Sequence, residues 1–222
     1  MNTSKRRRLL LVAALLGYLV ALWGLWPTVF VYPLKIFVVF LHELSHALAA
    51  IATGGQVASI TLDSQEGGAT WVIGGNRFIT LSAGYLGSLL WGLLLLALAC
   101  FRPRAARPVV QALGILTVLV TIVYVRGIFG VVFGLLFGAA LYAAGRRLRQ
   151  DWAVLLLSAL GLTSAVYALL DIRSDILLRP DTHSDAALLA QLTGIPALAW
   201  GLLWGALALA ACGLLLRRVW RS

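Results

Sequence analysis

The chain has 222 residues, of which 61% are hydrophobic and only 12% are charged. This composition is too apolar for a soluble domain of the same length, so we expect a polytopic membrane protein. The formal net charge of +10 does not indicate a nucleic-acid partner, because the basic residues stand in short clusters at the ends of apolar runs, as membrane anchors do.

Apolar runs long enough to cross a bilayer recur along the chain. A span needs about 20 mainly apolar residues. Such runs fall at residues 9–26, 29–53, 79–101, 108–125, 127–145, 152–171 and 196–216. The sequence therefore predicts an all-α polytopic membrane protein with six or seven transmembrane helices. The lower number applies if one run is re-entrant, or if residues 108–145 do not form two full spans. The basic residues divide almost evenly between the two sides of a seven-span arrangement, which leaves the orientation open.

Two stretches interrupt this apolar pattern. Residues 54–77 alternate small polar and β-branched residues around an acidic, glycine-containing turn, which is typical of a β-hairpin. Residues 171–194 hold four of the eight acidic residues of the chain and indicate a short amphipathic segment between two spans. Neither stretch is long enough for a separate soluble domain.

The segment His42-Glu43-Leu44-Ser45-His46 carries the chemistry that we expect of this chain. On a helix the two histidines lie on one face a turn apart, where both imidazoles can bind one Zn²⁺. Glu43 lies beside the same metal, where its carboxylate can take a proton from water and pass it to a leaving amine. Burying these three groups in lipid costs on the order of a few kcal/mol unless a cation compensates them, which argues against a chance pattern in an ordinary helix.

A catalytic zinc site needs a third protein ligand. Asp171 directly follows an apolar run and is therefore the late acidic residue expected to lie nearest the bilayer core. We expect Asp171 to be this ligand. Asp175 is the second candidate and Asp185 a further alternative. A solvated helix end is nevertheless the better interpretation of the later polar residues, with Ser184 or Asp185 capping the next helix. These residues are Asp181, His183 and Asp185.

The zinc motif and its surroundings resemble the site-2 protease family of intramembrane zinc metalloproteases. This resemblance lies mainly in residues 37–91. Besides the motif, the resemblance rests on residues 53–55 and 82–88 and, for a compact peptidase-like branch of the family, on residues 167–171 and 184–186. It implies an enzyme with one Zn²⁺ that cleaves transmembrane helices of membrane proteins. It also implies that the hairpin, at residues 57–73, presents a free edge on which unwound substrate pairs as an added strand.

Two departures from the family pattern motivate a second hypothesis. Family members often carry Ala-Gly-Pro followed by Asn one turn later, whereas this chain has Ala83-Gly84-Tyr85 and Ser88. The common Leu-Asp-Gly motif of the third ligand has no counterpart, because no Asp-Gly pair occurs in the chain. A catalytically degenerate, non-enzymatic scaffold of the same fold is therefore the alternative. The small residues around Gly84 fit close helix packing at least as well as substrate contact. A transporter is a third class, without an inverted repeat to support it.

We therefore expect residues 1–222 to form a single membrane-embedded, metalloprotease-like domain. Its core, with the zinc motif and the hairpin, is expected in residues 28–101, and the third-ligand region with the last helix in residues 152–216. The expected partners are a transmembrane protein substrate and the lipid bilayer, and no nucleic acid. The expected location is the cell membrane, as a multi-pass protein.

Overall fold

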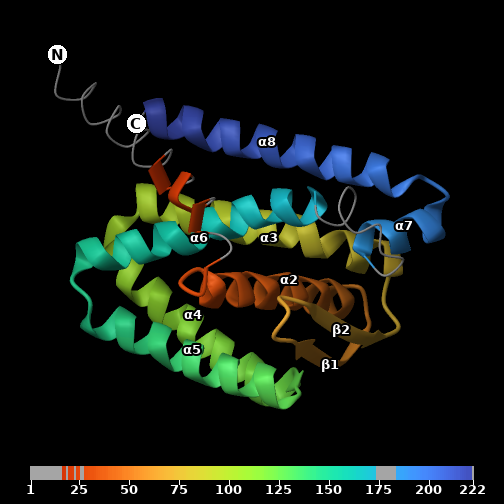
Figure 1. The fold of residues 1–222 in the computed structure, drawn as a ribbon, viewed down its shortest axis with the longest axis horizontal. Coiled ribbons are helices and arrows are strands. Elements are labelled where there is room, and N and C mark those ends of the chain that lie inside the picture. Colours follow the sequence, from red (N-terminus) through yellow and green to blue (C-terminus); the bar gives the residue numbers. More distant parts are fainter. Residues whose placement is uncertain (1–16, 19, 23, 26–27, 174–183, 222) are drawn as a thin grey trace.

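Helices dominate the chain, and one small sheet lies at the side of the helical bundle (Figure 1). The computed structural model describes residues 17–18, 20–22, 24–25, 28–173 and 184–221, with the side chains of 168–173 and 220–221 outside this description. The elements in chain order are α2 (Tyr32–Ala52), β1 (Gln56–Leu62), β2 (Gly68–Ile73), α3 (Arg77–Phe101), the 3₁₀ turn η1 (Pro103–Ala105), α4 (Ala106–Tyr124), β3 (Val125–Arg126), α5 (Ile128–Arg147), α6 (Gln150–Arg173), α7 (Asp185–Thr193) and α8 (Ala197–Arg221).

Five of the described helices are long and apolar enough to cross a membrane, namely α2, α3, α4 together with η1, α5 and α8. They coincide with five of the predicted runs, and residues 108–145 form two separate helices as expected. Helix α6 covers a sixth run, residues 152–171. The first run, residues 9–26, lies largely outside the described residues. The predicted all-α polytopic fold is confirmed, and the chain is an integral multi-pass membrane protein.

Helix α2 is the most enclosed of the five spans, whereas α8 is mostly exposed. A run of six consecutive apolar residues in α2, from Ile36 to Leu41, is buried on all sides. A helix that is apolar all round belongs inside a bundle, because it has no face for solvent. Helices α3 and α6 and the sheet pack around α2, so the motif segment in its second half is enclosed by protein.

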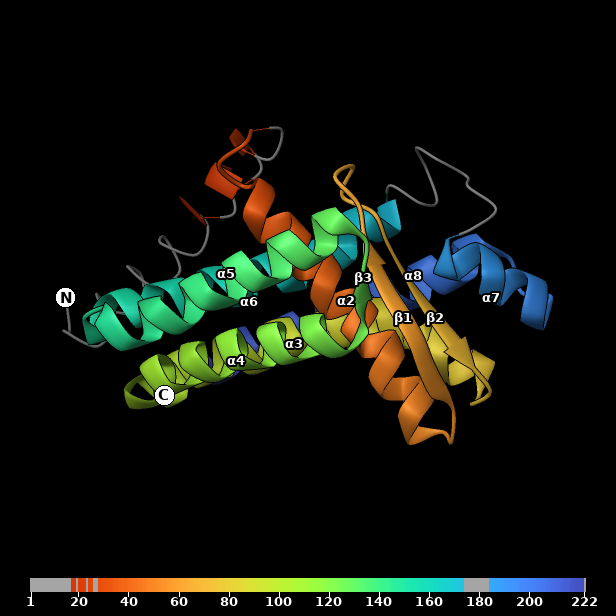
Figure 2. The same cartoon turned by 90° about the horizontal axis from the view of Figure 1, so that it is seen from below.

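The sheet stands beside α2, as Figure 2 shows. The predicted hairpin is confirmed: β1 and β2 pair antiparallel from Gln56↔Ile73 to Leu62↔Gly68. The sequence did not predict β3, which pairs parallel with β1 through Val125. The strand order is β2-β1-β3, so among the described residues only the outer edge of β2 and that of the two-residue β3 carry no strand.

Strand β3 lies at the junction of α4 and α5. The chain reverses there at Gly127, whose φ of 87° is in the left-handed region that glycine adopts without strain. The reversal lets the two helices run side by side while two residues between them reach β1. The sheet is thereby attached to the α4–α5 pair as well as to α2.

Candidate metal centre

The two histidines of the motif lie side by side on α2. His42 and His46 are one helical turn apart, and their ring centroids are 4.8 Å apart, as the four-residue spacing predicts. Both side chains are enclosed, with 12% and 9% of their area exposed. The sequence prediction of two converging imidazoles therefore agrees with the geometry.

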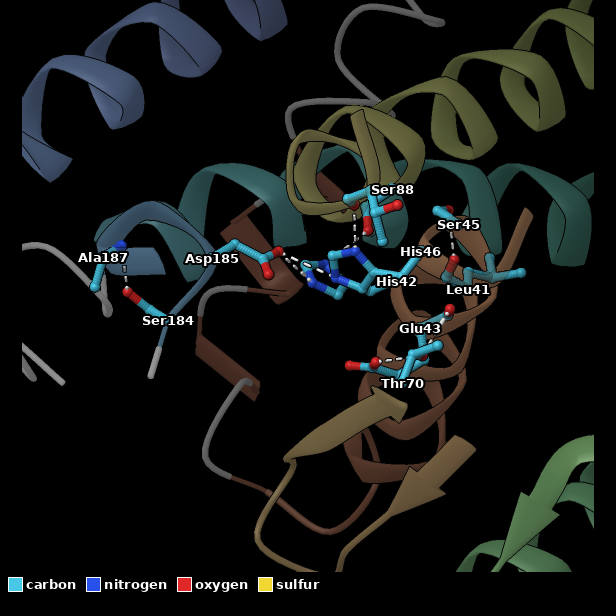
Figure 3. A network of polar contacts seen from close by, with 11 residues as sticks. Leu41, His42, Glu43, Ser45, His46, Thr70, Ser88, Ser184, Asp185 and Ala187 are labelled. Carbon is cyan, nitrogen blue, oxygen red and sulfur yellow. Dashed lines mark hydrogen bonds and ion pairs between the residues drawn. The ribbon is translucent and has the colours of Figure 1, made fainter. Parts of the chain in front are cut away.

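Asp185, the first residue of α7, lies against both imidazoles (Figure 3). Its Oδ2 is 3.2 Å from Nε2 of His42 and 3.1 Å from Nε2 of His46. Only 13% of its side chain is exposed. The interpretation of Asp185 as a solvated helix end is thus wrong. The capping prediction is right for Ser184, whose hydroxyl accepts a hydrogen bond from the amide of Ala187.

The other acids proposed from the sequence lie outside the described part of the chain. Asp171 falls in the last turn of α6, where side chains are not described, so its expected role as third ligand stays a prediction. The same holds for Asp175, and for the solvated-end interpretation of Asp181 and His183. Among the residues described, the group that can hold a metal ion is His42, His46 and Asp185.

Apolar packing holds α7 at the site. Ala186 and Leu189 are buried against Tyr85 of α3 and Trp204 of α8. The ring of Tyr85 also contacts the ring of His42, with centroids 5.3 Å apart, and that of Trp204, at 4.7 Å. Because Ala186 follows Asp185 directly, this contact fixes the carboxylate beside the histidines. From the sequence, Tyr85 stood out only because it occupies the place where family members often carry Pro, and no contact with His42 was expected of it.

The hydrogen bond between His46 and α3 sets the tautomer of the ring, and the tautomer shows that a cation must lie between the ring and Asp185. Nδ1 of His46 is 2.7 Å from the carbonyl oxygen of Thr80, and a carbonyl oxygen only accepts, so Nδ1 carries the hydrogen. In a neutral ring Nε2 then holds a lone pair, and this lone pair points at a carboxylate oxygen 3.1 Å away. Two acceptors at that distance repel each other unless a cation lies between them. A second proton or a metal ion is therefore required there.

Asp185 supplies the negative charge of the group. Burial by itself raises the pKa of its carboxyl, but the charges and hydrogen bonds of His46 and His42 outweigh it and hold the pKa below its usual range. Beside protonated imidazoles the carboxyl is thus an anion, which is also the form in which a carboxylate binds a metal ion.

The three side chains are of the kind that binds zinc, and their ligand atoms all lie within 4.8 Å of one another. Two imidazole nitrogens and a carboxylate are a donor set of catalytic zinc, which leaves a fourth position open. Donor atoms on one tetrahedral zinc, each about 2.0–2.2 Å from it, are roughly 3.3–3.6 Å apart. The observed Nε2–Oδ2 separations of 3.1 and 3.2 Å are close to this. The bond from His46 to Thr80 is the kind of outer contact that fixes the tautomer of a ligating histidine.

Gly84 of α3 keeps the space beside these ligand atoms open. A Cβ at this position would lie 2.5 Å from Oδ2 of Asp185 and closer still to Nε2 of His42. Gly87, one turn later, instead lets the side chain of Ser45 approach α3 closely. The small residues of this segment therefore serve both the site and helix packing. The sequence pattern favours helix packing at least as strongly as substrate contact.

His42 has a weaker outer contact than His46. Its Nδ1 is 3.5 Å from the hydroxyl oxygen of Ser88, which is at the limit of a hydrogen bond. Ser88 is fully buried, and its carbonyl oxygen accepts a 2.7 Å hydrogen bond from Ser164 of α6. Helix α6 thus fixes the turn of α3 that faces His42.

Glu43 is buried, and its side chain lies beside Thr70 of the sheet (Figure 3). Thr70 of β2 donates to it: the hydroxyl oxygen is 2.8 Å from Oε2 of the carboxylate and 2.9 Å from the backbone carbonyl oxygen of Glu43. Because consecutive residues of a helix are about 100° apart around its axis, the carboxylate lies on the side of α2 next to the one that carries the imidazoles. Thr70 was not among the residues singled out from the sequence, because a threonine in a strand carries no signal of its own.

With this geometry in place, comparison with known families gives a match over almost the whole chain. The model of the family described as Peptidase M50B-like matches residues 15–215. The chain belongs to this family. The Peptidase M50B-like proteins are part of the site-2 protease family of membrane metalloproteases, which confirms the resemblance found in the sequence. Comparison with curated proteins and with solved structures gives no match.

Proposed function

We propose that the protein is an intramembrane zinc metalloprotease that hydrolyses peptide bonds in or near transmembrane segments of other membrane proteins. The observation that carries this proposal is the approach of two imidazole Nε2 atoms to one buried carboxylate oxygen, at 3.2 and 3.1 Å. His42, His46 and Asp185 would hold one Zn²⁺. Membership in a peptidase family supports the same conclusion.

Different residues would supply the separate steps of peptide hydrolysis. When bound, Zn²⁺ supplies a Lewis acid that polarises a peptide carbonyl and makes water more acidic. The carboxylate of Glu43 accepts the proton that the attacking water loses and gives it to the amide nitrogen that leaves. Thr80 holds the ring of His46 with Nε2 toward the site. Enclosure of α2 keeps bulk water away from the group.

The outer edge of β2 would receive the substrate. A peptide bond inside a transmembrane helix has its backbone groups paired within that helix, so the helix must unwind before it can be cleaved. An extended segment then needs new backbone partners, and an open strand edge offers them as an added strand. Strand β2 has such an edge among the described residues and lies beside α2.

A catalytically degenerate scaffold of the same fold is the second candidate. The observation in its favour is that Tyr85 and Ser88 stand where family members often carry Pro and Asn, and Ser88 makes only a 3.5 Å contact with His42. In that case the site would hold metal without cleaving a substrate.

The test is a Glu43→Gln variant reconstituted in phospholipid vesicles with a single-pass reporter substrate. We expect cleavage to fall by at least about 100-fold, because proton transfer by a positioned side chain contributes roughly 10²–10⁴-fold. Bound zinc, measured by elemental analysis, should remain near one per chain. Asp151→Asn is the matched control: this exposed acid at the start of α6 undergoes the same carboxyl-to-amide change. Cleavage by Glu43→Gln at the wild-type rate would refute the role of Glu43, and zinc-loaded wild type that never cleaves would favour the scaffold.

A further inference from the structure

The carboxylate of Glu43 lies in a cradle formed by one face of β2. Thr70 donates to Oε2 at 2.8 Å (Figure 3). Gly68 lies beneath the other oxygen: a Cβ at Gly68 would come within 2.8 Å of Oε1 and 2.9 Å of a methyl group of Val39. Gly68 and Thr70 are two apart and therefore lie on the same face of the strand. Both carboxylate oxygens thus have their places set by β2.

The cradle leaves the two oxygens with different neighbours. A hydroxyl has one hydrogen to give, and here it points toward Oε2 and the backbone carbonyl of Glu43. Oε1 lies over Gly68, which has no side chain that could donate to it. An anion that accepts a hydrogen bond on one oxygen keeps lone pairs on the other for a proton. The cradle therefore fixes the rotamer of the Glu43 side chain. It holds Oε2 by a hydrogen bond and leaves Oε1 to accept a proton.

We propose that Thr70 is a positioning residue for Glu43, and that it couples the strand that receives substrate to the group that moves the proton. The proposal rests on the proposed function, because Glu43 has a proton to move only if the protein hydrolyses peptides. An extended substrate paired on the outer edge of β2 would hold this strand still. Through the hydroxyl of Thr70 it would hold the Glu43 carboxylate as well.

The hairpin does not depend on this hydroxyl for its place beside α2. At its tip, Lys35 Nζ is 2.8 Å from Oε1 of Glu66. At its base, the amide of Asn76 donates to the hydroxyl of Thr53 at 2.9 Å. Removing the hydroxyl of Thr70 should therefore leave the strand where it is and release only the carboxylate.

The experiment compares Thr70→Val with Thr70→Ser in the vesicle assay. A hydrogen bond to a charged group is worth roughly 10- to 100-fold in rate when it acts in the transition state. We expect Thr70→Val to lower kcat by about 10-fold or more with KM and zinc content unchanged, and Thr70→Ser, which keeps the hydroxyl, to restore most of kcat. Thr61→Val is the matched control, since Thr61 donates to Ala69 on the neighbouring strand. Wild-type kcat in Thr70→Val, or a loss confined to KM, would overturn the proposal.

A second measurement separates this proposal from the proposed function. Thermal unfolding is measured for Thr70→Val, Glu43→Ala and the double variant. If Thr70 holds Glu43, the valine substitution lowers Tm less in the Glu43→Ala background than in the wild type. Additive shifts would overturn the proposal even if the protein is an active protease. Non-additive shifts would support the contact even if the wild type cleaves nothing, an outcome that would refute the proposed function alone.

Discussion

Glycine brings the α4–α5 pair and the α2–α3 pair into close contact, and these two pairs use the contact differently. In the α4–α5 pair, a Cβ at Gly114 would lie 2.5 Å from the amide nitrogen of Tyr142 and 2.6 Å from the carbonyl oxygen of Gly138. The two backbones touch there. In the α2–α3 pair, a Cβ at Gly84 would instead meet a ring nitrogen of His42 and the carboxylate of Asp185. One contact is filled by backbone, and the other leaves room for ligand atoms.

The polar side chains of the two pairs differ in what they can bind. Arg107 and Gln111 of α4 donate across to the carbonyl oxygen of Gly145 in α5, but neither offers an imidazole or a carboxylate to a metal ion. In α4, the hydroxyls of Thr117 and Thr121 donate to carbonyls of their own helix one turn back, at 2.8 and 2.6 Å. In α2, by contrast, His46 donates across to Thr80 of α3. A hydroxyl satisfied within its own helix adds nothing to a site, whereas a ring held from the next helix is fixed in tautomer and direction. The difference teaches that small residues open space, and that the space can become a site where metal-binding side chains line it and are held in direction.

The largest effect is expected from removing the third ligand. Asp185→Ala should weaken zinc binding by more than about 100-fold, because even loss of an outer-shell partner costs roughly 10–100-fold. Equilibrium dialysis against buffered zinc with purified protein measures this. The α4–α5 pair is untouched by the change, so the helical content should stay the same.

Asp171→Ala is the matched comparison, because it tests the ligand that sequence position favours. We expect this variant to keep full zinc stoichiometry. Loss of zinc in Asp171→Ala together with retention in Asp185→Ala would reverse the ligand assignment. Retention in both would mean that the carboxylate next to the imidazoles is not a ligand at all.

A smaller loss of zinc affinity is expected from Gly84→Ala. This variant tests whether zinc binding needs the space that Gly84 leaves beside His42 and Asp185. The new methyl group must displace the Asp185 carboxylate or the His42 ring. We expect zinc affinity to fall by roughly 10–100-fold, by analogy with other changes around a metal site. Gly87→Ala serves as comparison, because its methyl group would meet the side chain of Ser45 and not a ligand. Equal zinc affinity in Gly84→Ala and wild type would show that Gly84 serves packing alone.

The sequence predicted the parts of the fold and site that follow from local periodicity. The helix period places His42 and His46 together, and the alternation of residues 57–73 predicts the hairpin. Strand β3 has only two residues, too few for any period to show. Its pairing with Ile60 depends on how α4 and α5 pack, which local sequence does not specify.

The third ligand illustrates a different limit. Asp185 is 143 residues from His42, and its place depends on α7 packing against Tyr85 and Trp204. The sequence favoured Asp171 because it lies next to an apolar run. Such proximity along the chain says little about depth in the membrane when a short helix such as α7 folds back onto the bundle. The Ser-Asp-Ala element at residues 184–186 was the available signal. Because either Ser184 or Asp185 can cap the helix that follows, the local sequence favours a solvated helix end there.

The smallest effect, and one confined to stability, is expected from Gly114→Ala in the α4–α5 pair. Because the methyl group would run into backbone atoms of α5, the helices must move apart, and overpacking of this kind costs about 1–3 kcal/mol. Thermal unfolding in detergent should show a lower Tm, while zinc stoichiometry stays near one per chain. A loss of zinc in this variant would contradict the distinction between a packing contact in α4–α5 and a metal site in α2–α3. It would mean that the α4–α5 contact, through β3 and the sheet, sets the geometry of the metal site as well as the stability of the bundle.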